Sequence, residues 1–371
     1  MSTQSTQELL ASALASNDKA RIVGLVDDLV EENAANRAEE VRVAQLARAI
    51  QLGLDDGSPD FDAVATYGET HAGVMEARKA LDRVLIDYLD GDATASEAED
   101  AVNTSIARKD DLEDAAADVR SLAETASIPP TLALDRISSR TVPKGQQIVI
   151  GSTVRNLGDR ALDDLTVTID GDLALTATSN SIASLGARSE RDLELTGTAA
   201  PAGQFQLQLA VSNDQASEST LFAVSVLAKG DYLHRARQQT QNLQDTLAGF
   251  DLTQPAATDG GPGGGPGGGG GGQGSVGGGH AGGQGPAAGL ANKLETIEQR
   301  LNQLIKHLEA GRPNVEAIDN QIGSVINTYG AFINQVEGME GNRLTAFQAA
   351  LLGEDARRTV ETLEKAQEAE V

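Results

Sequence analysis

The sequence predicts a multidomain protein of mixed α and β structure: an N-terminal α-helical bundle, a central β-sandwich, a Gly-rich flexible linker and a C-terminal helical hairpin or coiled-coil unit. Three observations support this. Apolar residues recur every three to four positions at both ends of the chain, which indicates helices. They alternate every second position in the middle, which indicates strands. A glycine tract then separates the last helices from everything before them. The 371 residues suffice for two or three such domains.

Residues 1–127 are predicted to form an acidic α-helical bundle. This stretch holds 27 acidic and 11 basic residues, and its interior positions are rich in alanine. Ser58 as N-cap with Pro59 at the first helical position can open one of its helices. The apolar stripe of the last helix is interrupted twice, at Ser105 and Lys109. We therefore expect a close-packed antiparallel bundle with two polar residues on one of its inner faces.

Residues 128–229 change period and are predicted to be a β-sandwich. The prolines of the sequence IPP end the helical region, because the residue before a proline avoids helical dihedrals. Short alternating segments follow, such as QQIVIGSTVRN and GQFQLQLAVSN, with Gly, Pro and Asp at the turns between them. About seven such strands in a hundred residues are typical of a two-sheet sandwich.

A strand ending in V-x-N-x-G, a turn to L-x-x-V-x-V and a later G-x-x-x-L-x-L-x-V give this region a recognisable pattern. The residues that carry it are Val154, Asn156, Gly158, Leu162, Leu165, Val167, Gly203, Phe205, Leu207, Leu209 and Val211. The pattern resembles the immunoglobulin-like modules of the CARDB and NEW3 type, over roughly residues 130–228. The resemblance implies an immunoglobulin-like β-sandwich. It also implies a role as a spacer or adhesive unit, which such modules usually have in exported proteins.

Residues 230–252 are predicted to be a connecting helix, and residues 253–289 a Gly-rich disordered linker. Nineteen of the thirty residues from Gly260 to Gly289 are glycine. Collagen needs glycine strictly every third position, and a Walker loop needs a terminal Gly-Lys-Ser/Thr, so neither pattern fits. A flexible chain of this length spans roughly 30 Å, and we expect it to tether the C-terminal helices to the rest.

Residues 290–371 show the most regular helical pattern of the chain and are predicted to form a helical hairpin or coiled-coil association unit. The predicted association seam comprises Leu294, Ile297, Leu301, Leu304, Leu308, Val315, Ile318, Ile322, Val325, Tyr329, Phe332 and Val336. The pattern leaves two interpretations open. The stripe can be the core of an intramolecular hairpin, or it can bind a protein partner or a second copy in a homo-oligomer.

The charge is strongly negative, with 29 basic against 55 acidic residues and a formal net charge of −26. Arginine is preferred over lysine, at 21 to 8. The composition resembles that of salt-in halophiles, especially haloarchaea, whose surface carboxylates are screened by molar salt. Without a basic stripe, nucleic-acid binding is not expected. No apolar run reaches transmembrane length and no signal-peptide pattern opens the chain, so we expect a cytoplasmic protein without a membrane span.

No residue pattern points to catalysis. The chain has no cysteine, which excludes disulfides, zinc thiolates and cysteine nucleophiles. The four histidines lack metal-ligand spacing, and the acidic segment from Asp90 to Asp100 lacks the glycine and glutamate of a calcium loop. We therefore assign no catalytic, cofactor-binding or metal residues. The main hypothesis is a non-enzymatic scaffold or adaptor. The alternatives are a module that binds a ligand, a surface glycan or a basic protein, and a regulatory subunit of an enzyme encoded elsewhere.

Overall fold

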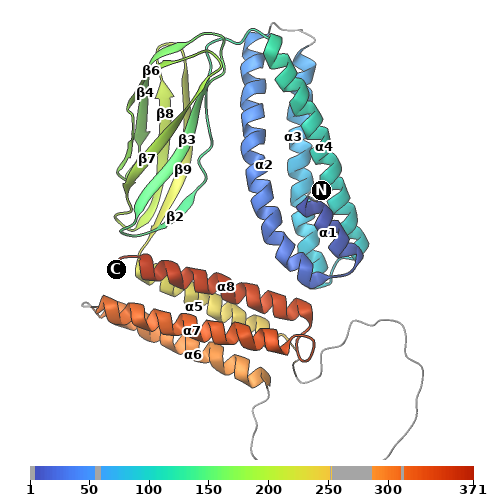
Figure 1. Ribbon diagram of the computed structural model, residues 1–371, viewed down its shortest axis with the longest axis vertical. Helices are drawn as coiled ribbons and strands as arrows, with labels where there is room; N and C mark the ends of the chain where they lie inside the picture. The colour runs from blue at the N-terminus through green and yellow to red at the C-terminus, as the bar shows by residue number, and fades with distance from the viewer. Residues whose placement is uncertain (1–4, 55–59, 251, 253–285, 311–312) are drawn as a thin grey trace, which may run out of the picture. The chain divides into compact units, whose positions relative to one another are not determined.

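The computed structural model describes residues 5–54, 60–250, 252, 286–310 and 313–371 (Figure 1). The predicted linker lies outside these residues up to position 285, and so do Ser58 and Pro59. The chain divides into two compact units. The first contains residues 1–229 and 368–371, and the second contains residues 230–367.

The first unit begins with four helices: α1 (Thr6–Ala15), α2 (Lys19–Gly53), α3 (Phe61–Asp90) and α4 (Ala95–Thr125). Local sequence explains their ends. The Ser5 and Thr94 hydroxyls each accept a hydrogen bond from the third residue of their helix, whose glutamate side chain accepts one in return. Gly91 ends α3 in the left-handed conformation, at φ +91°, which glycine adopts without a steric penalty.

A polar layer divides the interior of this bundle into two hydrophobic clusters. One cluster contains Leu10, Leu29 and Leu85 with their neighbours, and the other contains Val43, Tyr67 and Leu112 with theirs. The layer explains the two interruptions predicted in the last helix, now α4. Ser105 accepts a hydrogen bond of 3.1 Å from the Gln7 amide, and Lys109 forms an ion pair of 3.3 Å with Glu32. The Glu40–Arg78 ion pair, bidentate at 2.6 and 3.0 Å, completes it.

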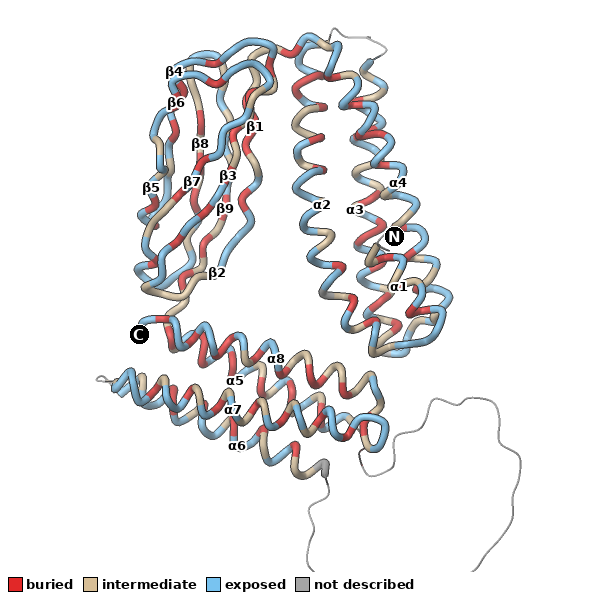
Figure 2. Tube along the Cα trace, viewed as in Figure 1, coloured by how far each residue is buried: buried red, intermediate tan, exposed pale blue. Residues whose placement is uncertain are grey.

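The middle of the first unit is a β domain of nine strands. They are β1 (Leu132–Leu134), β2 (Arg140–Pro143), β3 (Gln147–Asn156), β4 (Leu162–Asp170), β5 (Leu175–Ala177), β6 (Ser181–Leu185), β7 (Glu190–Thr198), β8 (Gly203–Ser212) and β9 (Ser217–Leu227). One sheet has the order β1-β3-β7-β5 and the other β2-β9-β8-β4-β6. All neighbours are antiparallel except β2 and β9. Inward side chains of both sheets form one core, and buried positions alternate along the strands (Figure 2).

Asn156 organises the turn that follows β3, which explains the asparagine and glycine of the sequence motif. Its side chain is buried, and its amide donates to the backbone carbonyls of Arg160, Leu185 and Gly186. Its carbonyl oxygen accepts from the backbone N–H of Gly158 at 3.0 Å. A Cβ at Gly158 would lie 2.6 Å from the carbonyl oxygen of Pro129, so no larger residue fits there.

The second unit consists of α5 (Lys229–Ala248), α6 (Pro286–Glu309), α7 (Val315–Met339) and α8 (Ala346–Glu368), counting the described residues. Successive helices run antiparallel. Gln241 of α5 donates to Glu298 of α6 at 2.9 Å, and Arg237 donates to Asn302 at 3.2 Å. The helices therefore form an up-and-down bundle.

This arrangement differs from the predicted connecting helix and tether. Helix α5 shares a bundle with α6, so the segment between them joins two helices of one unit and does not link two bodies. The reason is the apolar stripe of α5, which the polar residues of RARQQTQNLQ obscure in the sequence. Its buried positions include Tyr232, Leu233, Ala236, Leu243 and Leu247.

Candidate functional site

The predicted association seam lies almost entirely in the core of the second unit. Ten of its twelve residues are at most 2% exposed, while Leu308 is half-buried and Val315 is 41% exposed. Tyr329 sits at the centre of this core. Its hydroxyl lies 2.7 Å from the Thr240 hydroxyl of α5 and also hydrogen-bonds Thr359 of α8, and burial raises its pKa to about 12.

The seam is therefore occupied within its own chain. The stripe packs with α8, which lies inside the predicted unit 290–371, and with α5, which sequence reasoning had placed outside it. Ten of its residues are therefore not exposed for contact with another molecule.

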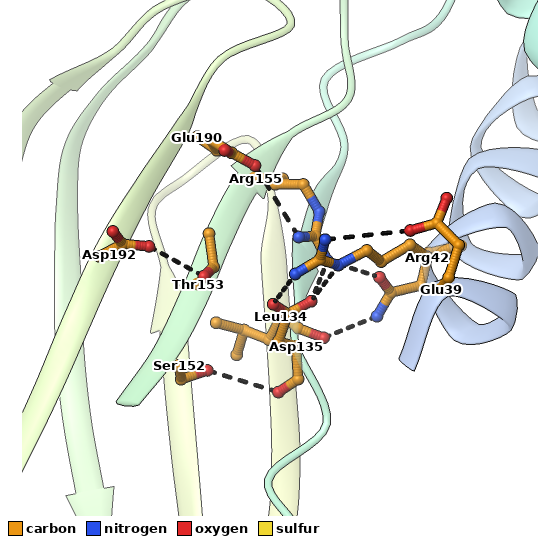
Figure 3. A network of polar contacts seen from close by, with 10 residues as sticks. Glu39, Arg42, Leu134, Asp135, Ser152, Thr153, Arg155, Glu190 and Asp192 are labelled. Carbon is orange, nitrogen blue, oxygen red and sulfur yellow. Dashed lines mark hydrogen bonds and ion pairs between the residues drawn. The ribbon is translucent and has the colours of Figure 1, made fainter. Parts of the chain in front are cut away.

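Sequence reasoning missed the junction between the N-terminal bundle and the β domain. Figure 3 shows its centre, where Asp135 accepts from two guanidinium groups. Arg42 of α2 contacts one carboxylate oxygen at 2.9 Å, and Arg155 of β3 contacts the other. The amide of Gln45 also donates to the Leu134 carbonyl at 2.7 Å. These contacts hold α2 against the edge where β1 pairs with β3.

The electrostatics of the junction favour the ionised carboxylate. Burial by itself raises the pKa of Asp135, but hydrogen bonds and charges from Arg155 and then Arg42 outweigh it, so the pKa is lowered. The Arg155 side chain is 12% exposed and the Asp135 side chain 22%. Salt screens such a partly buried pair less than it screens a surface pair.

A second set of contacts ties the end of α4 to the β domain. The Arg188 guanidinium donates to the backbone carbonyls of Ala123 and Ala126, the latter at 3.1 Å, and to Asp159 at 2.8 Å. Asp159 also accepts from the backbone N–H of Ile128 at 2.8 Å, which, with Arg188, lowers its pKa. A cation at the C-terminal end of a helix also interacts favourably with the negative end of the helix dipole.

Two hollows flank the junction within the first unit. One, of about 490 Å³, lies between Ala38 and Val41 of α2 and the outward residues Gly151, Thr153 and Asp192 of the four-stranded sheet. The other, of about 550 Å³, is lined by residues from α2, α4, β3, β7 and the connecting segments. Both depend on the junction, because each takes its walls from the bundle and the β domain together.

Two histidines of the described residues, His71 and His234, make isolated contacts. His71 stacks on Tyr67 with ring centroids 6.1 Å apart, and its Nε2 lies 3.6 Å from Glu40. His234 lies 4.0 Å from Glu309. Among the residues that the structure describes, no group of three His, Cys, Asp or Glu side chains is placed to hold a metal ion. None of the described helices is long and apolar enough to cross a membrane.

No family model and no curated protein matches the chain. Similar solved structures include the ASH/PapD-like domain 7 of human CEP192, with 9% identity over 27% of this chain and 87% of that one and a TM-score of 0.22. The CARDB domain of the PF1109 protein from Pyrococcus furiosus, solved with di-metal ions, has 18% identity over 27% and 90%, with a TM-score of 0.21. E. coli alpha-2-macroglobulin has 10% identity over 66% of this chain and 22% of its own, with a TM-score of 0.22. TM-scores at this level establish neither a fold nor a function.

The residues of the junction could not be predicted to meet from the sequence. Arg42, Asp135 and Arg155 are 93 and 20 positions apart along the chain, in segments with unrelated patterns. The available signal was Arg155 itself, a long cation between two core positions of a strand, at Val154 and Asn156. Charged residues are common on the outward face of an alternating strand, however, so Arg155 by itself does not reveal that α2 packs there.

Proposed function

We propose that this chain is a non-enzymatic scaffold or adaptor of a salt-adapted cell, in which the helical bundle and an immunoglobulin-like β domain act as one semi-rigid body. One observation carries the proposal: the ion pairs of Asp135 and the Arg188 contacts join the bundle to the β domain at two separate places. Two such attachments oppose both bending and rotation about the connecting segment. A fixed relation between two domains is what a spacer or scaffold requires.

Association belongs, in this proposal, to the outer surface of the second unit. Because ten seam residues are buried within the unit, we choose the shallow hollow between α7 and α8 as the candidate surface. Its volume is about 670 Å³, and the half-buried residues Ile326, Ile333 and Val360 line it. A protein partner or a second copy can bury such a surface.

Rigidity of the first unit is tested by measuring a distance across the junction. The chain has no cysteine, so the substitutions Glu31→Cys in α2 and Ser184→Cys in β6, both at exposed positions, give the only two thiols to which spin labels attach. Pulsed electron spin resonance should give a narrow distance distribution, which Asp135→Asn broadens. The exposed Asp192→Asn, on the same sheet, is the matched control and should leave it narrow. A broad distribution in the labelled chain that keeps Asp135 would remove the basis of the proposal.

Association is tested on the full chain by light-scattering mass after gel filtration in multimolar KCl. A truncation after Pro286 is a poor comparison, because it removes three helices of one bundle and exposes the core of α5. Ile333→Glu should instead lower any oligomeric mass to that of the monomer. A mass that this substitution does not change would place the association surface elsewhere.

A second candidate function is that of a ligand-binding module. The observation that favours it is the hollow of about 550 Å³ at the junction, whose walls combine arginine side chains with an apolar surface.

A further inference from the structure

Residues 368–371, the strap, are part of the first unit, although helix α8 leads directly into them. They lie against the turn between β2 and β3 and against the first residue of α5. The surface that they cover, the seat, consists of Lys144, Gly145, Gln146 and Lys229. The strap is thus a short peptide bound to the β domain by residues distant from it in the sequence.

Hydrogen bonds to main-chain atoms hold the strap on the seat. The Glu370 N–H donates to the Lys144 carbonyl at 2.9 Å, and the Glu370 carbonyl accepts from the Lys229 N–H at 2.9 Å. The side-chain amide of Gln146 donates to the Glu368 carbonyl at 3.1 Å. Because every peptide has these main-chain groups, the seat can hold a segment other than the strap.

The seat also sets a limit on side-chain size. Ala369 is 3% exposed, whereas Val371 at the end of the strap is 43% exposed. The Glu370 side chain lies over Gly145, where an added Cβ would be 2.4 Å from the carbons of that side chain. The seat therefore selects a small residue at the position of Ala369 and a glycine beneath the residue that follows it.

The contacts of the strap favour an exchangeable segment over a permanent one. Each backbone hydrogen bond adds little net stability, because the same groups bond water when the strap is released. Ordering the four strap residues costs conformational entropy of comparable size. The bound and released states are therefore close in free energy, and another peptide with the same groups can compete for the seat.

We propose that the seat binds an extended peptide of a partner protein, with a small residue flanked by acidic ones, and that the strap is its intramolecular competitor. The acidic flanks follow from Glu368 and Glu370 of the strap and from Lys144, whose ammonium donates to a Val371 oxygen. The proposal goes beyond the scaffold role and does not depend on it. A bound partner peptide displaces the strap and so releases the end of α8 from the β domain.

The test is a ligand-observed NMR titration of the full chain in multimolar KCl with the acetylated peptide QEAEV, which copies residues 367–371. The receptor is the variant Ala369→Asp, whose strap is released because the new carboxylate would be buried in the seat. We expect saturable binding to this variant, and binding at least about fivefold weaker to the unmodified chain, where the strap competes. The peptide QELEV should bind the variant at least about tenfold more weakly, because its leucine is too large. Equal binding of the two peptides, equal binding to the two chains, or no saturable binding would overturn the proposal.

Amide hydrogen exchange locates the binding. The Lys229 N–H, which donates to Glu370, should exchange at least about tenfold faster in Ala369→Asp and should regain protection when QEAEV is added. Val371→Ala, at the exposed end of the strap, is the control and should change this exchange by less than about twofold. If QEAEV binds without protecting Lys229, or if Ala369→Asp leaves the exchange of Lys229 unchanged, the seat is not the binding site and the proposal is wrong.

Discussion

The ion pair between Glu40 and Arg78 is the contact whose loss should most damage the N-terminal bundle. Both side chains lie in the layer between the two hydrophobic clusters, with 10% of the Glu40 side chain and 3% of the Arg78 side chain exposed. Replacing Glu40 by Gln keeps the shape and one acceptor but removes the charge. It leaves the Arg78 guanidinium buried without a counter-ion.

The expected cost follows from the burial of the pair. Removing one partner of a buried ion pair typically costs 3–5 kcal/mol, and a retained hydrogen bond places Glu40→Gln near the lower value, about 3 kcal/mol. Glu39→Gln should cost less than about 1 kcal/mol, since Glu39 is 54% exposed although its carboxylate lies 2.8 Å from Arg120. The double variant Glu40→Leu with Arg78→Met should lie within about 1 kcal/mol of the parent, because it leaves no unpaired charge.

Native-state hydrogen exchange in multimolar KCl measures the loss of stability in the helices beside the pair. Amides of α2 and α3 beside the pair should exchange about a hundredfold faster in Glu40→Gln, which corresponds to about 3 kcal/mol. Exchange in Glu39→Gln should change by less than about fivefold. The reasoning is refuted if Glu40→Gln changes exchange no more than Glu39→Gln, or if the double variant is less stable than the single one.

Two further predictions concern the second unit. Because burial raises the folded-state pKa of Tyr329 to about 12, above an unfolded value of about 10, its stabilising contribution should be complete below pH 10 and lost as the pH rises toward 12. Thermal melts at pH 9 and near pH 12 should show this loss, and Tyr329→Phe should lack that pH-dependent part. Within the predicted seam, Leu301→Ala should lower the free energy of unfolding by about 2–5 kcal/mol, because Leu301 is fully buried. Val315→Ala should lower it by less than about 0.5 kcal/mol, because Val315 is 41% exposed. Chemical denaturation measures both values. Equal effects would contradict the internal placement of the seam.

The contact between the bundle and the β domain should weaken at low pH. The pKa of Asp135 is lowered in the folded state, so its contribution is present above the unfolded pKa of about 3.9 and is lost as the pH falls through the lower folded value. The labelled pair at Glu31 and Ser184 should therefore show a broader distance distribution in acid. Asp135→Asn should be broad at every pH, and a distribution that stays narrow in acid would count against the role of this carboxylate.

Local sequence determined where the helices, strands and turns form. Capping residues such as Thr94, the helix-ending Gly91 and the alternation of the strand segments are properties of neighbouring residues, so periodicity predicts helices at both ends and strands between. The same holds for Asn156 and Gly158, whose spacing in the motif is the spacing that the turn after β3 requires. Local interactions of this kind involve few residues and can be recognised without knowing what surrounds them.

Tertiary structure alone decided what the elements pack against. The stripe from Leu294 to Val336 has the same pattern whether it faces α5 or another molecule, and only the tertiary packing, which buries ten of its residues, assigns it to the interior. Likewise Arg42, Asp135 and Arg155 meet because β1 pairs with β3 beside α2. Hydrophobic burial is non-directional, and these ion pairs join residues distant in sequence. The sequence alone therefore does not identify which residues contact each other.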